Sequence, residues 1–368
     1  MDEVLTLRKG WKNWRLCHRD CGPLVVAWAL VCGVLLTSPG SSEADNSVLP
    51  YVRTGLEAEL PPNSARSVRS LPPEAVAGLK GWGHLYELLT RHGTDHQVAF
   101  EILSDERMPQ REKLYFSLNP RESKHLYRKH NTPLARQNAV RFYRNHYRYF
   151  KEASRVYRVP DSVILAILQV ETNCGRYTGQ SRTFYRLARL ASAATPDNIK
   201  ANVERSRRKA DLAAVRERAE WLEEHFLPHV VSTIRLAEDM KVHPLEVRGS
   251  GAGAIGLPQF LPGNVYTFGK DGNGDRTVNL FEPADAIHSI ANYLSEHGWD
   301  SNRPLTIKDK RQVIWAYNRS DSYIDTVLAM ASALEPQLTD VERNLESLFR
   351  SLSVKGVIGR RLAEPAKQ

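Results

Sequence analysis

The sequence has 368 residues, of which 42% are hydrophobic, and a formal net charge of +9 at pH 7. This length and apolar content allow a sizeable core, which excludes an intrinsically disordered protein and indicates one large domain with a smaller accessory one. The positive charge suits a polyanionic partner. We expect no nucleic-acid partner, because no dense run of Lys and Arg is interleaved with aromatic residues.

The N-terminus has the pattern of a secretion signal. Five basic residues lie between positions 8 and 19, and the apolar run 23–36 that follows is too short to span a membrane. Ser42 and Ala44 are small residues at the two positions that a signal peptidase reads. We therefore predict a signal peptide over 1–44 and export to the periplasm. An uncleaved signal anchor is the alternative, because the basic region is unusually long.

Cysteine usage limits how the exported chain can be stabilised. Cys17, Cys21 and Cys32 lie in the segment expected to be removed, which leaves Cys174 alone in the mature chain. A single cysteine excludes an intrachain disulfide and a zinc site of the usual Cys/His spacing. Its stability must therefore come from the core.

The remaining pattern predicts a mainly α fold. Residues 45–72 are polar and rich in Pro and Ser, which indicates a linker, and 73–125 should form an N-terminal helical region with two helices separated at Gly93. Apolar spacing predicts a long helix over 133–157, another over 181–194, and a solvated, highly charged helical hairpin over 199–240. No alternating pattern is long enough to predict a sheet.

The segment 159–175 predicts a buried helix. Pro160 lies just inside its start, Asp161 or Ser162 is the expected N-cap, and Gly175 is the expected stop. The residues between them leave no polar face, so other helices should enclose this one.

Glu171 stands near the end of this apolar helix. Desolvation and the negative end of the helix dipole should both raise its pKa. A carboxylic acid that is still protonated near neutral pH can donate a proton to the leaving oxygen of a glycosidic bond. The alternative is that Glu171 extends into solvent, as helix-terminal glutamates commonly do.

Two further stretches carry polar side chains among glycines. Residues 248–262 contain four glycines, which permit close backbone approach, but they lack the spacing of a phosphate-binding loop; a tight structural turn is the alternative. Residues 271–282 have the ligand spacing of an EF-hand calcium loop, with Arg276 at the position where glycine is usual. A simple surface turn is the alternative here.

The last third of the chain adds an amphipathic helix over 279–299, closed by Gly298, and a Tyr317-Asn318 pair at a helix end. Aromatic and amide groups of this kind suit sugars, which present hydroxyls together with apolar ring faces.

The order of these motifs resembles the membrane-bound lytic transglycosylase B family. Val-Glu171-Thr is followed by the Gly-Ser250 loop ending in Gln259-Phe-x-Pro, the Asp-rich loop, Ala-Asn-Tyr293, and Tyr317-Asn318. The resemblance spans about 82–334 and implies a lysozyme-like helical catalytic domain, which we place at 126–335. It leaves a basic tail, 336–368, without a counterpart, and the region 199–240 is longer than it requires.

The resemblance also implies a chemistry. The family cleaves the MurNAc-β-1,4-GlcNAc bond of peptidoglycan and leaves 1,6-anhydromuramoyl ends, with Glu171 matching its single acid and base. The positions that match its substrate cleft are Tyr127, Ser250, Gln259, Tyr293, Tyr317 and Asn318. Those that match its calcium loop are Asp271, Asn273, Asp275 and the backbone of Thr277, with Glu282 or Asp285 completing the set.

No cofactor is needed for such chemistry, and calcium would be structural. We expect a monomer that binds peptidoglycan glycan strands, with the basic tail available to the envelope surface. A hydrolytic muramidase and a non-catalytic peptidoglycan-binding protein remain as alternatives.

Overall fold

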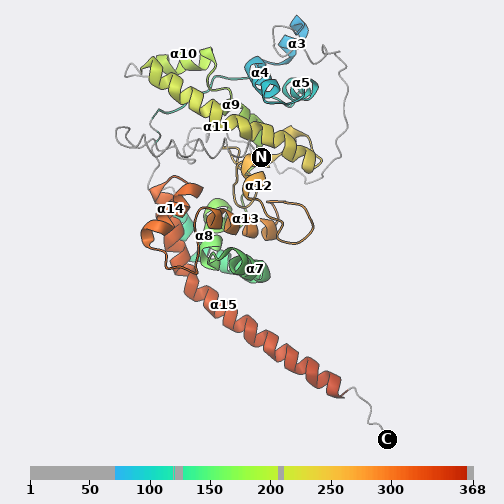
Figure 1. Cartoon of the computed structure of the whole chain (residues 1–368), viewed down its shortest axis with the longest axis vertical. Coiled ribbons are helices and arrows are strands. Elements are labelled where there is room, and N and C mark those ends of the chain that lie inside the picture. The colour runs from blue at the N-terminus through green and yellow to red at the C-terminus, as the bar shows by residue number, and fades with distance from the viewer. Residues whose placement is uncertain (1–70, 119, 121–126, 206–210, 363–368) are drawn as a thin grey trace.

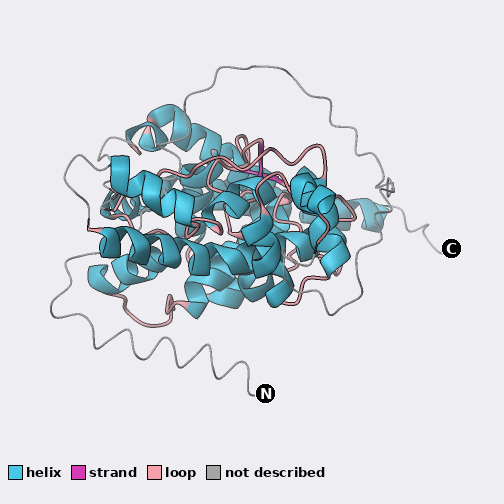
Figure 2. Cartoon of the chain, turned by 90° about the horizontal axis from the view of Figure 1, so that it is seen from above, coloured by secondary structure: helices cyan, strands magenta, loops and turns pink. Residues whose placement is uncertain are grey.

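The computed structural model describes residues 71–118, 120, 127–205 and 211–362. Helices dominate this part of the chain, which confirms the predicted mainly α class (Figures 1 and 2). Its only strands, β1 (Ser181–Arg182) and β2 (Arg248–Gly249), form a short antiparallel pair. The predicted signal peptide and all but the last two residues of the predicted linker lie outside the described residues.

The described residues form a series of helices along the chain. In order they are α3 (Pro73–Gly78), α4 (Gly83–Arg91), α5 (His96–Ser104), η2 (Arg128–Asn131), α6 (Pro133–Asn145), α7 (Tyr147–Tyr157), α8 (Asp161–Thr172), α9 (Thr183–Leu190), α10 (Pro196–Arg205), α11 (Leu212–Asp239), η3 (Pro244–Glu246), α12 (Pro262–Phe268), α13 (Pro283–Glu296), α14 (Ile307–Tyr317) and α15 (Asp321–Leu362). None of the helices in the described ranges is both long enough and apolar enough to cross a membrane.

Helix α8 is the centre of the first hydrophobic core. It packs against α6, α7, α13 and α15, and every residue from Val163 to Val170 is buried. Burial on all sides confirms the prediction that other helices enclose this segment. Figure 1 shows these elements together in the lower part of the molecule.

A second core joins the N-terminal helices to α9 and α11. Val215, Ala219, Leu222 and Phe226 line the buried face of α11, so this helix is packed into the molecule. The prediction of helices in 199–240 is correct, but the prediction of a solvated hairpin held by surface ion pairs is wrong. The one i,i+4 ion pair in the described part of the hairpin, Lys200–Glu204, is 3.9 Å long and exposed. Hydrophobic burial stabilises the region more than such a pair can.

Two helix boundaries differ from the predictions. The helix expected over 133–157 breaks into α6 and α7 at His146, whose backbone N–H donates to the carbonyls of Phe142 and Tyr143. The break contains neither Gly nor Pro, so no local sequence signal marks it. The helix expected over 181–194 is shorter, because residues 181–182 pair with β2 and α9 ends at Leu190.

Helix α15 continues through the place where a separate tail was expected. Pro336 lies inside it, and Leu334, Leu338 and Val341 on both sides of the proline are buried in the first core. This packing compensates for the backbone hydrogen bond that proline removes. The predicted boundary at 335/336 therefore does not coincide with any break in the helix, whose far end projects from the body (Figure 1).

A polar cluster ties the start of α8 to α15. Pro160 is the N-cap, and Asp161 does not cap the helix as expected: its Oδ2 instead accepts a hydrogen bond of 2.8 Å from the Tyr143 hydroxyl. That hydroxyl also lies 2.8 Å from Glu342 Oε1, and Lys151 Nζ lies 3.3 Å from Asp161 and 3.1 Å from Glu342. Burial and the two carboxylates raise the pKa of Tyr143. The cluster thus fixes α6, α8 and α15 to one another.

We predict that Tyr143→Phe lowers the free energy of unfolding by about 1–3 kcal/mol, because it deprives buried Asp161 of a donor. Urea denaturation measures this loss. Tyr147→Phe on α7 is the matched control, since it removes a hydroxyl from a half-buried ring that packs edge-on against Tyr143 at 5.7 Å. Equal losses in the two variants would contradict a special role for the cluster.

Candidate active site

Glu171 lies in the last turn of α8, next to a tight turn that leads to the glycine-rich loop. The helix ends at Thr172, earlier than the predicted stop, and Asn173 and Cys174 then take left-handed conformations with φ of 53° and 56°. Thr172 Oγ1 donates to Leu257 O at 3.0 Å and accepts from Gly175 N at 2.9 Å. The end of α8 is thereby attached to residues 248–262.

The carboxyl group of Glu171 is enclosed and hydrogen-bonded. The hydroxyl of Tyr323, at the start of α15, donates to Glu171 Oε1 at 2.6 Å. Burial raises the pKa of Glu171 to about 7, and the Tyr323 hydrogen bond opposes this rise by stabilising the anion. Glu171 is half-buried and fixed, so the alternative in which it extends into solvent does not hold.

Aromatic side chains form a row beside this carboxyl group. The ring of Tyr127 meets that of Tyr323 edge-on at 5.6 Å, and Tyr323 lies nearly parallel to Tyr317, with ring centres 6.4 Å apart. Tyr293 follows at 5.0 Å from Tyr317. The structure therefore brings together three predicted cleft residues, Tyr127, Tyr293 and Tyr317, and adds Tyr323.

The hydroxyls of two of these tyrosines are bound to the backbone. Tyr317 donates to Pro258 O at 2.6 Å, and Tyr293 donates to Ala316 O at 2.7 Å. These bonds hold the rings in place. Tyr293 is buried and stacks on His297 at 4.1 Å, whereas Tyr317 stays partly exposed. Asn318 caps the end of α14 and is 8% exposed; its Oδ1 has no hydrogen-bond partner among the described residues.

Sequence reasoning missed Tyr323. A weak signal exists, because Ser320 stands three residues earlier and its Oγ accepts from Tyr323 N at 3.1 Å, which is the spacing of a helix cap. That signal predicts the start of α15 but cannot reveal that the tyrosine faces Glu171, 152 residues away in the chain.

Ser250 and Gln259 lie in the glycine-rich loop on the other side of the Glu171 turn. Ser250 Oγ accepts from Ala254 N at 3.2 Å, and Gln259 Nε2 donates to Thr178 O at 3.1 Å and Gly256 O at 2.9 Å. A Cβ atom on Gly256, whose φ is 69°, would lie 2.5 Å from the backbone oxygen of Leu280. The close approach predicted for these glycines is therefore to the protein itself, which gives the loop a fixed shape.

The loop 271–282 is shaped by its own side chains. Asp271 Oδ1 accepts from Gly274 N at 2.7 Å and its Oδ2 from Arg276 N at 2.7 Å, while Asp275 Oδ1 accepts from Thr277 N at 2.8 Å. These backbone hydrogen bonds lower the pKa of Asp271, and the bonds from Thr277 lower that of Asp275. Arg276 has φ 72°, so it adopts the left-handed conformation that glycine would supply at this position.

The oxygen atoms of the side chains in this loop are of the kind that bind a hard cation. Asn273 Nδ2 donates to Asp275 Oδ2 at 3.0 Å and Glu282 Oε2 at 2.9 Å, so these three side chains meet. Across the described ranges no three His, Cys, Asp or Glu residues lie close enough to hold a metal ion, so an ion here would also need amide or carbonyl oxygens. Oxygen donors of this mixed kind fit calcium.

Asp285 has a different role in this loop. Its side chain is fully buried, and its two oxygens accept from Gly272 N at 2.8 Å and Asn279 N at 2.7 Å. Burial raises its pKa against the effect of these bonds. The geometry thus assigns Asp285 to joining the two ends of the loop, and Glu282 is the better placed of the two acids expected to complete a metal site.

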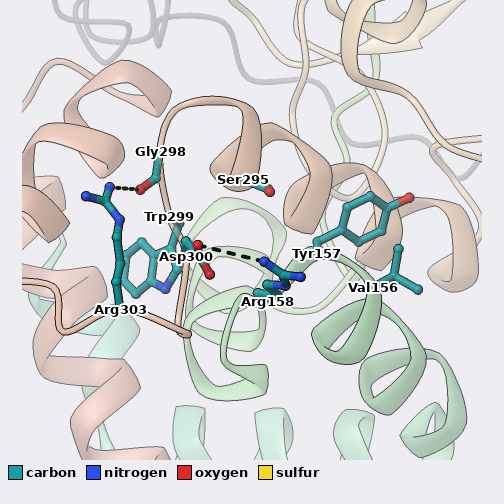
Figure 3. Close-up of a pocket in the computed structure, with 8 residues that line it drawn as sticks. All are labelled: Val156, Tyr157, Arg158, Ser295, Gly298, Trp299, Asp300 and Arg303. Carbon is teal, nitrogen blue, oxygen red and sulfur yellow. Dashed lines mark hydrogen bonds and ion pairs between the residues drawn. The ribbon is translucent and has the colours of Figure 1, made fainter.

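A cavity of about 400 Å³ lies between the end of α7 and the end of α13, and Glu171 does not line it (Figure 3). Its two arginines are engaged: Arg158 pairs with Asp300 at 3.9 Å, and Arg303 donates to Gly298 O at 3.0 Å. Beneath them the buried Trp299 lines the cavity. These contacts join α7 to the end of α13, so the cavity is a structural junction apart from the acid.

Comparison with known proteins identifies the family. Residues 81–310 match the family described as the transglycosylase SLT domain. The membrane-bound lytic murein transglycosylase B of Escherichia coli strain K12 is 30% identical over 276 residues, which are 72% of this chain and 70% of that protein. The chain belongs to the transglycosylase SLT-domain family. The resemblance inferred from the motif order is thereby confirmed. The chain is a lytic murein transglycosylase, an enzyme that acts on peptidoglycan.

Solved structures of similar fold agree with this assignment. The soluble lytic transglycosylase SltB1 from Pseudomonas aeruginosa has a TM-score of 0.54 and 22% identity, covering 71% of this chain and 99% of that one. The Escherichia coli lytic transglycosylase SLT35 in complex with calcium has a TM-score of 0.53 and 22% identity, covering 74% of this chain and 95% of that one. The lysozyme-like helical fold predicted for the transglycosylase is confirmed.

The raised pKa of Glu171 predicts a pH-dependent stability. Unfolded, Glu171 ionises near its ordinary pKa of 4.5, whereas the folded chain retains the proton up to about 7. Between these values folding must take up a proton, so wild-type stability falls as pH rises, by at most about 3 kcal/mol at 1.36 kcal/mol per pH unit. Below pH 4.5 Glu171 causes no loss of stability, because it is protonated in both the folded and the unfolded chain. Above pH 7 the loss no longer changes with pH, because Glu171 is ionised in both.

We therefore expect Glu171→Gln to stabilise the protein, relative to wild type, by up to about 3 kcal/mol more at pH 8 than at pH 4. Urea denaturation across this range measures the difference. Glu224→Gln, at an exposed position of α11, supplies the control. A difference that does not change with pH would mean that Glu171 ionises normally in the folded protein.

Proposed function

We propose that the protein is a peptidoglycan lytic transglycosylase that cleaves the MurNAc-β-1,4-GlcNAc bond and forms 1,6-anhydromuramoyl ends, with Glu171 as its single acid and base. The observation that carries the proposal is the enclosed Glu171 carboxyl group with a pKa of about 7. Burial and Tyr323 account for that pKa, and no second acid in the described part of the chain contributes to it. A two-carboxylate mechanism would place another acid close by.

The reaction needs one group that acts twice. Protonated Glu171 donates its proton to the glycosidic oxygen as the bond to the muramoyl anomeric carbon breaks, and the GlcNAc hydroxyl leaves. The Glu171 carboxylate then accepts the proton of the muramoyl 6-hydroxyl, whose oxygen bonds to the anomeric carbon and closes the anhydro ring. The enzyme recovers its proton and no water is consumed. Tyr323 stabilises the carboxylate through its hydrogen bond between the two steps.

The aromatic row would position the sugars. Tyr317 is partly exposed next to the acid, and sugar rings pack on aromatic faces of this kind. The buried rings of Tyr127 and Tyr323 would support it from within the protein. Asn318 Oδ1 is a buried acceptor without a partner in the described part of the chain, so an N–H or hydroxyl of the substrate would satisfy it. Ser250 and Gln259 border the same turn and complete the proposed cleft.

A hydrolytic muramidase is the nearest alternative, since it could use the same acid with water as the nucleophile. It is less well supported because the second carboxylate that activates water in such enzymes has no counterpart acting on Glu171 within the described residues. A non-catalytic binding protein is disfavoured as well, because glycan binding alone does not require a carboxyl group with a pKa near 7.

Mass spectrometry of the products from purified sacculi tests the proposal. We expect wild type to release anhydromuropeptides and Glu171→Gln to reduce their rate of formation by at least about 100-fold, since removal of a general acid alone commonly costs 100- to 10,000-fold. Glu224→Gln should release the same products as wild type. Muropeptides with a reducing end would instead establish a hydrolase, and substantial turnover by Glu171→Gln would exclude this residue as the acid.

We also propose that the loop 271–282 binds calcium as a structural ion. Asp271, Asn273, Asp275 and Glu282 would supply side-chain oxygens and Thr277 its carbonyl, and the ion would fix the loop against α13 without entering the chemistry. The complex of SLT35 with calcium is consistent with this. Arg276 brings a cation to the loop and adopts a strained φ, and both features should weaken binding.

Thermal unfolding with calcium and with a chelator tests the loop. At about one hundred times its dissociation constant, calcium should stabilise the protein by about 2.7 kcal/mol, and Asp275→Ala should abolish that gain. Arg276→Gly should bind calcium more tightly, because it removes both the cation and the strain. Asp340→Asn, at an exposed site on α15, is the control. Identical melting curves in calcium and chelator would exclude the ion.

The place of action is a further expectation. The N-terminal pattern of residues 1–44 supports export to the periplasm, where peptidoglycan lies, and the Escherichia coli relative is described as membrane-bound.

A further inference from the structure

One face of α11 carries a continuous column of flat and basic side chains. The guanidinium of Arg218 lies 4.7 Å from the ring centre of Trp221, Trp221 stacks on His225 with centres 4.6 Å apart and planes 14° apart, and His225 meets His229 at 5.8 Å. Their spacing of three, four and four residues keeps them on one side of the helix. We call these four residues the basic stripe.

The basic stripe lies along the edge of the hydrophobic face of α11, where Trp221 packs against the second core, and it extends toward the candidate active site. Gly263 N, at the start of α12, donates to His229 Nδ1 at 3.2 Å, which joins the stripe to the segment that follows Gln259. At its other side is Arg319, which follows Asn318 between α14 and α15 and whose charge lowers the pKa of His225. The stripe is therefore next to the elements that present Tyr317 and Tyr323.

His225 lies beside two cations. Desolvation and the charges of Arg319 and Arg218 lower its pKa to about 4. Its imidazole is therefore neutral near pH 7, and the positive charge on this side of α11 comes from the arginines.

Arg218 has no acidic partner among the described residues. It is half-buried, burial lowers its pKa, and its Nε is buried without a hydrogen-bond partner in the described part of the chain. Within the same ranges it forms no salt bridge. An unpaired buried donor is costly, so such groups commonly mark the place of a bound ligand or ion. The two charges that act on His225 are also both cationic.

We propose that the basic stripe binds a carboxylate of the peptide attached to the muramoyl residue of the substrate. This inference rests on the proposed function, which brings a muramoyl residue to Glu171. The hydroxyl and acetamido groups of the glycan are neutral, so they would not require a desolvated guanidinium. The peptide carries carboxylates, which pair with arginine, and its backbone and methyl groups can pack on the Trp221–His225 surface.

Binding to the catalytically inactive Glu171→Gln protein tests this without turnover. The probes are the disaccharide tetrapeptide GlcNAc-MurNAc-tetrapeptide and the same compound with its peptide carboxylates converted to amides, measured by calorimetry. We expect the acid form to bind about tenfold more tightly than the amide form, as one charge-assisted hydrogen bond supplies. Adding Arg218→Gln should abolish this preference, and Arg218→Lys should retain part of it.

Arg216→Gln is the matched control, because it removes the same charge from an exposed position on the same helix. It should keep the full preference, which separates a specific contact from the general attraction of a basic protein for acids. Equal binding of the two probes when Arg218 is present would overturn the proposal. Equal weakening of both probes by Arg218→Gln would also overturn it, because that is the result of a structural role.

The test separates this inference from the proposed function. If wild type released no anhydromuropeptides but the acid probe were still preferred through Arg218, the chemistry would be wrong and the stripe correct. If anhydromuropeptides formed and neither probe bound in a manner that depends on Arg218, the chemistry would stand and the stripe would not.

Discussion

The hydrogen bond from Tyr323 to Glu171 constrains much of this structure. It joins the end of α8 to the start of α15, two elements separated by 152 positions in the chain. A hydrogen bond of 2.6 Å forms only if α15 is docked along α8. The buried residues on both sides of Pro336 and the contact of Glu342 with Tyr143 hold α15 in that position. The position of the Glu171 carboxyl group is thus set by the packing of α15 against α8.

The same bond sets the balance of charge at the site. Burial alone would raise the pKa of Glu171, and a hydrogen bond to the anion opposes that rise. A group that must first donate and then accept a proton benefits from a pKa near the working pH, because neither form is then strongly disfavoured. The helices that enclose Glu171 raise its pKa, and the hydrogen bond from Tyr323 lowers it.

Short stretches of sequence predicted some elements of the structure correctly and others wrongly. The uninterrupted apolar run before Glu171 predicted an enclosed helix, which the structure confirms. The calcium-loop spacing of 271–282 stays a prediction, with Arg276 where glycine is usual. The break at His146 was missed because no glycine or proline marks it. The solvated hairpin was wrong because charge density along α11 hid a four-residue apolar spacing, Val215 to Ala219 and Leu222 to Phe226, that packs against α9.

Contacts between distant segments could not be predicted in the same way. Tyr323 is one tyrosine among fourteen, and only the docking of α15 brings it to Glu171. Arg218 is one of many charged residues in 199–240, and its unpaired Nε becomes visible only once its surroundings are known. Resemblance to a family supplied the acid and several cleft positions, since motif order carries information that periodicity lacks.

The placement of the cations follows a separate physical requirement. An arginine close to Glu171 would stabilise the carboxylate and lower its pKa, which would remove the proton that the proposed first step needs. Neither Arg218 nor Arg319 contributes to the pKa of Glu171, although both act on His225. The positive charge of these two arginines therefore leaves the proton of Glu171 in place. A substrate with a neutral scissile bond and a charged side arm would match this separation, because the arm can reach the cations while the bond stays beside the neutral acid.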